Sequence, residues 1–534
     1  MQAINEQALR ILRLFGNTTS RRVIPYVGPE QEYFLIDKEK YLKRKDLIYT
    51  GRTLFGAKPA KGQEMDDHYF GSIRPRIGAF MKDLNEELWR LGVSAKTQHN
   101  EGAPAQHELA PIYTQVNVAV DHNQMVMETM KRVAGQHGLV CLLHEKPFAG
   151  VNGSGKHNNW SLTSDDGINL MNPGETPHEN VQFLLVLACV MTAVDRHADL
   201  LRESCAVPGN DQRLGAAEAP PAIISMFLGE QLEDVIDQLC STGEATHSKQ
   251  GDVLKTGVAT LPDLAKDATD RNRTSPFAFT GNKFEFRMVG SSASVSSPNV
   301  VLNTIVAEAF KEAADELEQA EDFSEAVHDL IKRLFVEHRR IIFSGNGYSK
   351  EWVEEAERRG LPNLHSGIDS VEALRTEKAK KLFEDFGVYT SAELESLAEI
   401  EYDIYAKTMN IEARTMIDIA SKQIIPAVVK YTTELAKSLS AVREACPEAD
   451  TSVQKEILLE TSDLLAEMKH ALAKLQDERV KAHKISDNKE CAYAYLNNVV
   501  PAMNALRAPA DKLEMIVDKE LWPFPSYGDL IFEV

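Results

Sequence analysis

Cysteine, long apolar runs and positive charge are all scarce in this sequence, and each scarcity excludes a class of protein. The six cysteines among 534 residues are scattered without a Cys-x-x-Cys pair, which indicates free thiols in a reducing compartment and excludes a disulfide framework or a cysteine zinc site. No apolar run is long enough to span a bilayer. The net charge of −21 argues against nucleic acid as the main partner. We therefore expect a soluble cytoplasmic protein with no nucleic-acid or membrane partner.

The length of the chain exceeds what one simple core usually holds, so several domains or one large domain with appended helices are expected. Residues 1–22 carry apolar side chains at helical spacing, which predicts an amphipathic helix and not a signal peptide. Strand-like and helical patterns then mix over residues 23–345, with an acidic insertion at about 227–262. Residues 346–534 are almost wholly helical in pattern. The predicted fold class is therefore α+β with a helical C-terminal region.

Periodicity also predicts the individual elements. Strands are expected over 23–27, 33–36, 113–120, 141–147, 156–162 and 284–289, and helices over 76–91, 124–135 and 181–201.

Three long amphipathic helices are expected near the C-terminus, over 411–442, 453–475 and 493–513. Pro426 should kink the first of them. Antiparallel packing of the helices on one another is the simplest interpretation. A partner-binding coiled coil is the alternative, but the heptads are not sustained.

The stretch from Gly28 to Asp37 brings two carboxylates together. Its apolar residues predict a strand, and side chains two apart on a strand point to the same face. Glu30 and Glu32 therefore project side by side, where they repel each other unless a cation lies between them. Two glutamates on a solvated edge strand would explain the same pattern without a metal.

Three further stretches offer partners for this pair. Glu101 and Glu108 flank a Gly/Ala/Pro turn that can fold the two carboxylates towards one point. His157 follows two glycines, which let backbone approach a ligand closely. Glu285 and Arg287 share one face of a predicted strand. Each could be structural when taken alone: a capping glutamate, a core histidine or a surface ion pair.

Together these motifs resemble the glutamine synthetase family, and its third type in particular. The family's motifs occur in its order: Gly-Pro-Glu-x-Glu from Gly28, Asn-Glu-Gly-Ala-Pro-Ala-Gln-His-Glu from Asn100, Asn-Gly-Ser-Gly-Lys-His-Asn from Asn152, and Glu-Phe-Arg from Glu285. The stretches 411–416 and 522–529 also resemble the third type. The resemblance implies a catalytic domain of the glutamine synthetase and guanidino-kinase type, with a curved antiparallel sheet flanked by helices.

The resemblance also implies two divalent cations, Mg²⁺ or Mn²⁺, held by six side chains. The first cation would be held by Glu32, Glu101 and Glu108, and the second by Glu30, His157 and Glu285. Carboxylate-rich sites with open positions suit these ions, which keep waters and accept phosphate oxygens.

The substrates implied by the resemblance are L-glutamate, ammonium and ATP. Arg213 and Arg287 would hold glutamate by guanidinium–carboxylate pairing, together with Asn152 and Gly153. Ser161, Lys283 and Arg273 would lie on the nucleotide side, with Arg273 near the transferring phosphoryl group. Glu218, in Glu-Ala-Pro, would shield the intermediate and accept a proton from ammonium. The implied assembly is a homo-oligomer of stacked hexameric rings.

The sequence departs from the family pattern at its start. Family members carry a small β-grasp domain ahead of the first motif, and here only residues 1–22 precede the strand that holds this motif, so we expect that domain to be lacking. Lys283 and Ala278 stand where the family has arginines. Two alternatives to glutamine synthesis therefore stay open, namely a ligase like glutamate–cysteine ligase and an inactive truncated scaffold or regulator.

Overall fold

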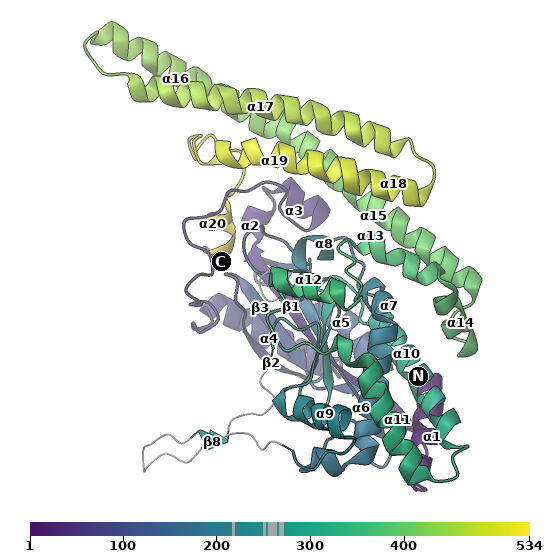
Figure 1. Cartoon of the computed structure of the whole chain (residues 1–534). Coiled ribbons are helices and arrows are strands. Elements are labelled where there is room, and N and C mark those ends of the chain that lie inside the picture. Colours follow the sequence, from purple (N-terminus) through teal and green to yellow (C-terminus); the bar gives the residue numbers. More distant parts are fainter. Residues whose placement is uncertain (216–218, 249–252, 255–263, 266–271) are drawn as a thin grey trace.

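A nine-stranded sheet forms the centre of the molecule (Figure 1). The computed structural model describes residues 1–215, 219–248, 253–254, 264–265 and 272–534. The strands lie in the order β2 (Ala95–Asn100), β3 (Gln106–Pro111), β1 (Val23–Asp37), β6 (Gly155–Ser164), β11 (Phe284–Gly290), β10 (Phe277–Phe279) and β7 (Met226–Phe227), with β4 (Thr114–Gln115) and β5 (Leu139–Leu142) paired to β1. The pairs are antiparallel except β10 with β7, which is parallel. The α+β fold class is confirmed, and the sheet that was predicted to be antiparallel contains one parallel pair, β10 with β7.

Strand β1 is the element on which the sheet is built. The two predicted strands at 23–27 and 33–36 are one continuous strand, paired to β6 and β5 along one edge and to β4 and β3 along the other. Its odd-numbered Tyr33 and Leu35 pack with α4 (Pro75–Arg90) and α5 (Val116–Gln136). Since successive side chains alternate between faces, Glu30 and Glu32 project from the opposite face.

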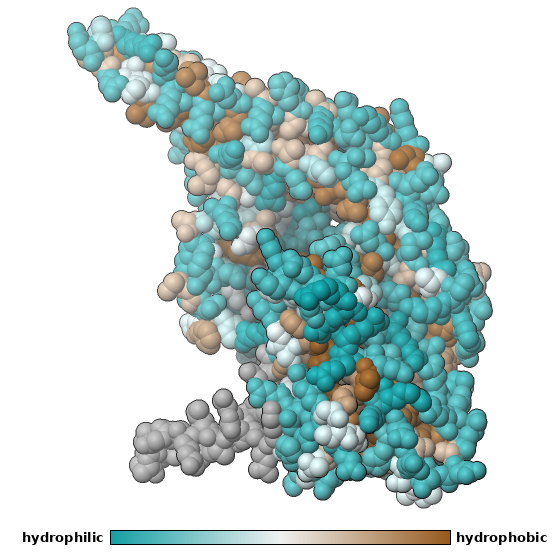
Figure 2. All heavy atoms as spheres, in the orientation of Figure 1, coloured by the Kyte–Doolittle hydropathy of each residue, from teal (hydrophilic) through white to brown (hydrophobic). Residues whose placement is uncertain are grey.

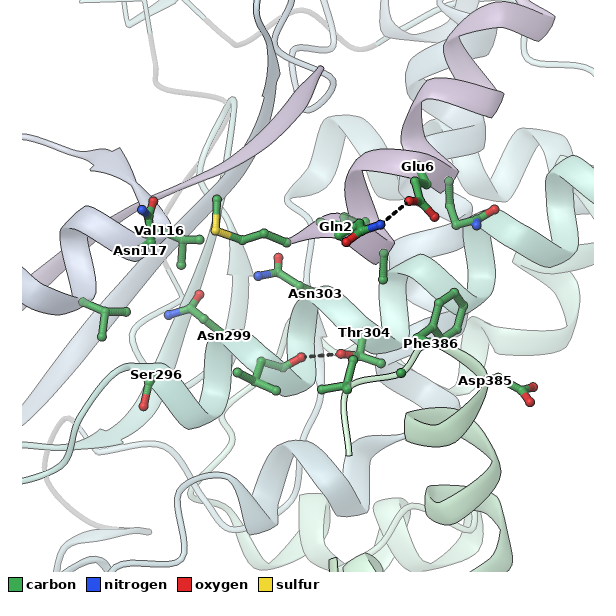
Figure 3. Close-up of a pocket in the computed structure, with 18 of the residues that line it drawn as sticks. Gln2, Glu6, Val116, Asn117, Ser296, Asn299, Asn303, Thr304, Asp385 and Phe386 are labelled. Carbon is green, nitrogen blue, oxygen red and sulfur yellow. Dashed lines mark hydrogen bonds between the residues drawn. The ribbon is translucent and has the colours of Figure 1, made fainter. Parts of the chain in front are cut away.

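Apolar helices cover the rest of the sheet. Helix α6 (Val181–Arg196) is buried from Phe183 to Asp195 and packs with α10 (Ser296–Leu317) and α11 (Phe323–His338). The N-terminal helix α1 (Gln2–Leu14), which was predicted, packs on α10. A cavity of about 680 Å³ lies between α1, α5 and α10 (Figure 3). None of the predicted site residues within the described ranges lines it.

Three predicted elements are corrected by the structure. The strand expected over 113–120 is confined to Thr114–Gln115, because Val116 and Ala119 are buried at helical spacing at the start of α5. The strand expected over 141–147 ends at Leu142. The helix expected over 181–201 is broken at His197, whose Nε2 lies 2.6 Å from Glu308 Oε2, and α7 (Ala198–Glu203) follows.

The long C-terminal helices pack antiparallel, as predicted. Helices α16 (Ile425–Ala445) and α17 (Ser452–His483) form a hairpin that extends beyond the rest of the molecule, and α17 also packs on α19 (Val500–Glu514) (Figure 1). Hydrophilic residues predominate on the visible face of this hairpin (Figure 2). A five-residue π-helical turn, Ala420–Ile424, separates α15 (Ser391–Ile419) from α16. The interruption lies next to Pro426, whose ring cannot continue regular helix hydrogen bonding.

Two simpler predictions are also tested. All six cysteines, each within the described ranges, are free thiols. In the part of the chain that the structure describes, no helix combines the length and apolar character needed to cross a membrane.

Glu203, at the end of α7, predicts a pH dependence of stability. Burial, and to a lesser extent the charge of Glu401, raise the pKa of its carboxyl to about 8. The folded state therefore holds a proton that the unfolded chain releases above its ordinary pKa of 4.5. Since the folded state binds more protons in this window, the free energy of unfolding should fall as the pH rises from about 4.5 to about 8.

The measurement is the thermal unfolding midpoint of the wild type and of Glu203→Gln at about pH 5 and about pH 8. We expect the variant to lose less stability than the wild type between the two conditions, because an amide does not titrate. An equal fall in both proteins would assign the pH dependence to other groups.

Candidate functional site

The register of three adjacent strands brings most of the predicted metal ligands together. Glu30 on β1 lies directly opposite His157 on β6, and Glu32 lies opposite Glu108 on β3. Directly opposed side chains in an antiparallel pair have Cβ atoms about 5 Å apart. Glu285 joins them from β11, where it pairs with Asn159 of β6. The sheet thus presents carboxylates and one imidazole on a single face.

Two overlapping groups of potential metal ligands form on this face. Glu30, Glu108 and His157 each offer one atom within 4.8 Å of the others, and so do His99, Glu101 and Glu108. Glu108 belongs to both groups and so lies between two neighbouring cation positions. Oxygen donors with one imidazole in each group suit divalent cations such as Mg²⁺ and Mn²⁺.

The remaining two predicted ligands lie beside these groups and make other contacts. Glu32 Oε2 accepts a hydrogen bond of 2.5 Å from the Gly155 amide. Glu285 Oε1 lies 3.0 Å from His157 Nδ1, and its Oε2 accepts a hydrogen bond of 2.9 Å from Arg287. Glu285 and Arg287 therefore share one face of β11, as predicted, and they form a buried ion pair.

His99 is a residue that the sequence analysis missed. Its Nε2 lies 2.8 Å from Glu108 Oε2 and its Nδ1 lies 3.5 Å from Glu101 Oε1. The hydrogen bond to Glu108 raises the pKa of His99 to about 9. The available signal was alternation, because His99 is two residues before Glu101 at the end of β2 and so shares its face.

Burial and neighbouring charges together set the pKa values of His157 and Glu285, two ligands predicted for the second cation. Burial opposes the protonated form of His157, but the carboxylates of Glu285 and Glu30 raise its pKa well above the usual value. Burial likewise opposes the charge of Glu285, and His157 and Arg287 nevertheless lower its pKa. The carboxylates thus hold a positive charge between them, which is the place a cation would take. Metal binding to such a site displaces the proton.

A tight turn carries Glu101 and Glu108. The Glu101 amide donates to the Gln106 carbonyl at 2.9 Å, and the Gln106 amide donates to the Ala103 carbonyl at 3.0 Å. Ala105 has φ +63°, a left-handed conformation that few non-glycine residues adopt. The turn is also held from outside, because His68 Nδ1 lies 2.7 Å from the Glu101 carbonyl oxygen.

The glycine-rich loop before β6 passes close to two buried groups. A Cβ atom on Gly153 would lie 2.3 Å from the Glu145 carbonyl oxygen, and one on Gly155 would lie 2.0 Å from the Arg213 guanidinium. Only glycine fits at position 153, where the obstructing atom is backbone, and a side chain at position 155 would displace the Arg213 guanidinium. The Gln63 side chain makes two hydrogen bonds to Asn152: its Nε2 donates to Asn152 Oδ1 at 2.6 Å, and its Oε1 accepts from the Asn152 backbone amide at 2.8 Å.

Two buried arginines lie behind this loop. Arg213 donates to backbone carbonyls of β11 at 3.2–3.4 Å. Arg287 donates to the Asn272 carbonyl at 2.6 Å as well as to Glu285. In both residues Nε is buried without a hydrogen-bond partner among the described residues. Buried guanidinium donors with spare capacity suit an anionic ligand such as a carboxylate.

The predicted nucleotide-side residues lie further along the sheet. Ser161 is four residues after His157 on β6 and so lies on the same face, and Lys283 is two residues before Glu285, immediately ahead of β11. Arg273 is exposed in the turn that Arg287 contacts through Asn272. Glu218 lies outside the described residues.

Comparison with known proteins agrees with the motifs. The family model described as "Glutamine synthetase, catalytic domain" matches residues 11–192, and "Glutamine synthetase C-terminal domain" matches residues 326–443. The chain is 46% identical to "Type-3 glutamine synthetase" of Dictyostelium discoideum over 100% of this chain and 73% of the relative. It is 44% identical to "Glutamine synthetase" of Butyrivibrio fibrisolvens and 42% identical to that of Bacteroides fragilis, over all of this chain and 76% and 74% of those proteins.

Three observations indicate the same family: the four motifs on adjacent strands, the two family models, and relatives of 42–46% identity that match the whole of this chain. The chain belongs to the glutamine synthetase family, and to its third type.

Proposed function

We propose that this chain ligates ammonia to L-glutamate at the expense of ATP, which is converted to ADP and phosphate, giving L-glutamine through a γ-glutamyl phosphate intermediate. The observation that carries the proposal is the pair of ligand groups sharing Glu108, with Arg287 buried next to Glu285. Such an arrangement offers two cation positions beside a binding place for a carboxylate. Both features suit phosphoryl transfer to a carboxylate, because the cations neutralise the phosphate charge and the arginine holds the acceptor.

Six side chains would hold the two cations. We propose Glu32, Glu101 and Glu108 for the first and Glu30, His157 and Glu285 for the second. The donor chemistry fits, since the groups combine carboxylates with an imidazole and contain no cysteine. When bound, the cations would neutralise phosphate charge and orient the γ-phosphoryl group.

The other residues would bind and position the substrates. We propose that Arg213 and Arg287 pair with the carboxylates of glutamate and that Asn152 and Gly153 hold its backbone atoms. Arg273 would stabilise charge on the transferring phosphoryl group, with Ser161 and Lys283 on the nucleotide side. Ser161 and Arg287 lie on β6 and β11, the strands that carry His157 and Glu285, and this placement supports their roles.

The reaction would proceed in two steps. A γ-carboxylate oxygen of glutamate bonds to the γ-phosphorus of ATP while the bond to the bridging oxygen breaks and ADP leaves. Ammonia then bonds to the acyl carbon, the carbon–oxygen bond to phosphate breaks, and phosphate leaves. A proton from the nitrogen passes to a base, for which we propose Glu218. Closing the site against water would protect the acyl phosphate.

We also propose a cytoplasmic location and a homo-oligomer of stacked hexameric rings. The acidic net charge and the free cysteines support the location, and membership of the family supports both proposals.

The test is Mg²⁺-dependent phosphate release from ATP with glutamate, with and without ammonia. We expect release that requires glutamate and rises with ammonia, together with glutamine formation. Release that depends on cysteine in place of ammonia would favour a glutamate–cysteine type of ligase. No release under any condition would favour the inactive scaffold.

His99→Gln should weaken cation binding while leaving the fold intact. The imidazole contacts both Glu101 and Glu108, and losing an outer partner of a metal ligand typically lowers metal affinity by about 10- to 100-fold. Mn²⁺ titration followed by electron paramagnetic resonance measures this affinity directly. Wild-type affinity in His99→Gln would show that His99 does not orient these carboxylates.

A further inference from the structure

Gln106 uses every one of its hydrogen-bonding groups inside the site. Its backbone amide and carbonyl close the Glu101–Glu108 turn. Its side-chain oxygen accepts from the Ala103 amide at 3.2 Å, and its Nε2 donates to the Gly153 carbonyl at 2.8 Å and to Ser154 Oγ at 3.0 Å. The residue is 1% exposed, so water does not compete for these bonds.

The Gln106 side chain therefore joins two stretches that have separate roles. On one side is the turn whose carboxylates Glu101 and Glu108 belong to a ligand group. On the other side is the loop of Asn152 and Gly153, where glutamate would bind. The carbonyl of Gly153 is fixed directly by Gln106, and Asn152 is fixed by Gln63. A displacement of either stretch must break or strain a hydrogen bond of Gln106.

We propose that Gln106 is a positioning residue that couples occupation of the first cation site to binding of glutamate. This inference rests on the proposed function. A cation that orders Glu101 and Glu108 also orders the turn, and Gln106 transmits that order to the Gly153 carbonyl. Coupling between two ligands is reciprocal, so glutamate raises the affinity for the cation by the same factor.

Gln106→Glu tests the coupling because it keeps the side-chain shape and removes the donor. In its ionised form the carboxylate would face the Gly153 carbonyl, where no hydrogen bond can form. The probe is Mn²⁺ alone, titrated against the full chain by electron paramagnetic resonance, with and without saturating glutamate. We expect glutamate to tighten Mn²⁺ binding in the wild type and not in the variant.

Steady-state kinetics give a second readout. The KM for glutamate and the dissociation constant for Mn²⁺ should each rise about tenfold in Gln106→Glu. At saturating divalent cation the KM for ATP should stay close to the wild-type value, since Gln106 contacts neither Ser161 nor Lys283. A general loss of structure would raise all three constants together, so it would contradict the proposed role.

Gln98→Glu is the matched control. Gln98 lies on the neighbouring strand β2 and donates to the Met81 carbonyl and to Asn85 at 3.0 Å and 2.6 Å, away from both ligand groups. Gln98→Glu should retain wild-type coupling.

Gln106→Met is the variant to use if the buried carboxylate of Gln106→Glu prevents folding, because methionine removes the donor without adding charge.

The outcomes separate the inference from the proposed function. Undiminished coupling in a folded Gln106 variant overturns the inference alone. Failure of the wild type to bind Mn²⁺ or to release phosphate overturns the proposed function and the inference with it. Loss of coupling in the Gln106 variants with retention in Gln98→Glu supports both.

Discussion

Glu101→Ala is expected to lower glutamate-dependent phosphate release from ATP by about 10³-fold or more. Glu101 belongs to one of the two ligand groups and is 8% exposed at the end of a turn that Gln106 holds closed. Alanine removes a charged ligand that water cannot replace at equal strength. Cations stabilise charge in phosphoryl transfer by several kcal/mol, and each 1.4 kcal/mol changes the rate about tenfold.

The rate should be measured at saturating Mg²⁺ and again across a Mg²⁺ series. A shifted Mg²⁺ dependence with partial recovery at high concentration would identify lost affinity as the cause. Glu128→Ala is the control, because Glu128 is an exposed glutamate on α5 and alanine is a good helix former. An undiminished rate in Glu101→Ala would remove Glu101 from the site.

Asp46→Asn is expected to destabilise the fold by about 3–5 kcal/mol, the cost of breaking a buried ion pair. Asp46 and Arg44 are each 1% exposed and joined by two hydrogen bonds of 2.6 Å and 2.9 Å. Arg44 also donates to the Pro525 carbonyl and lies over the Phe524 ring at 4.3 Å. Neutralising Asp46 leaves a buried guanidinium charge without its counter-ion.

The measurement is the thermal unfolding midpoint, which should fall by several degrees or more. Asp385→Asn breaks the exposed Lys381–Asp385 pair and should cost less than about 1 kcal/mol. Replacing both Arg44 and Asp46 by apolar residues should cost less than Asp46→Asn alone, since no unpaired charge then stays buried. Equal midpoints for Asp46→Asn and the wild type would contradict the argument.

The sequence was most informative where chemistry and local periodicity coincide. Alternation along a strand was sufficient to predict that Glu30 and Glu32 share a face, and motif order identified the family. The strand prediction was wrong at Val116. The β-branched residues there favoured a strand, but Val116 begins helix α5 and is buried on its inner face. Propensity of this kind is weak beside tertiary packing.

Contacts between distant parts of the chain could not be predicted from local patterns. Nothing near Asp46 indicates that its partner Arg44 contacts Pro525, 481 residues away. The pairing of β1 with β3 determines that Glu108 lies opposite Glu32, and a single sequence does not state register. The contact of His99 with Glu108 depends in the same way on the register of β2 with β3, although alternation alone indicates that His99 and Glu101 share a face.

The double-sided pairing of β1 has a consequence for how this protein can change in evolution. A one-residue insertion or deletion between Val23 and Asp37 would turn half of the strand over, because side chains alternate with a period of two. Glu30 and Glu32 would then face the core that Tyr33 and Leu35 occupy. Homologues should therefore vary in length in the connecting loops and keep the residue count of this strand constant.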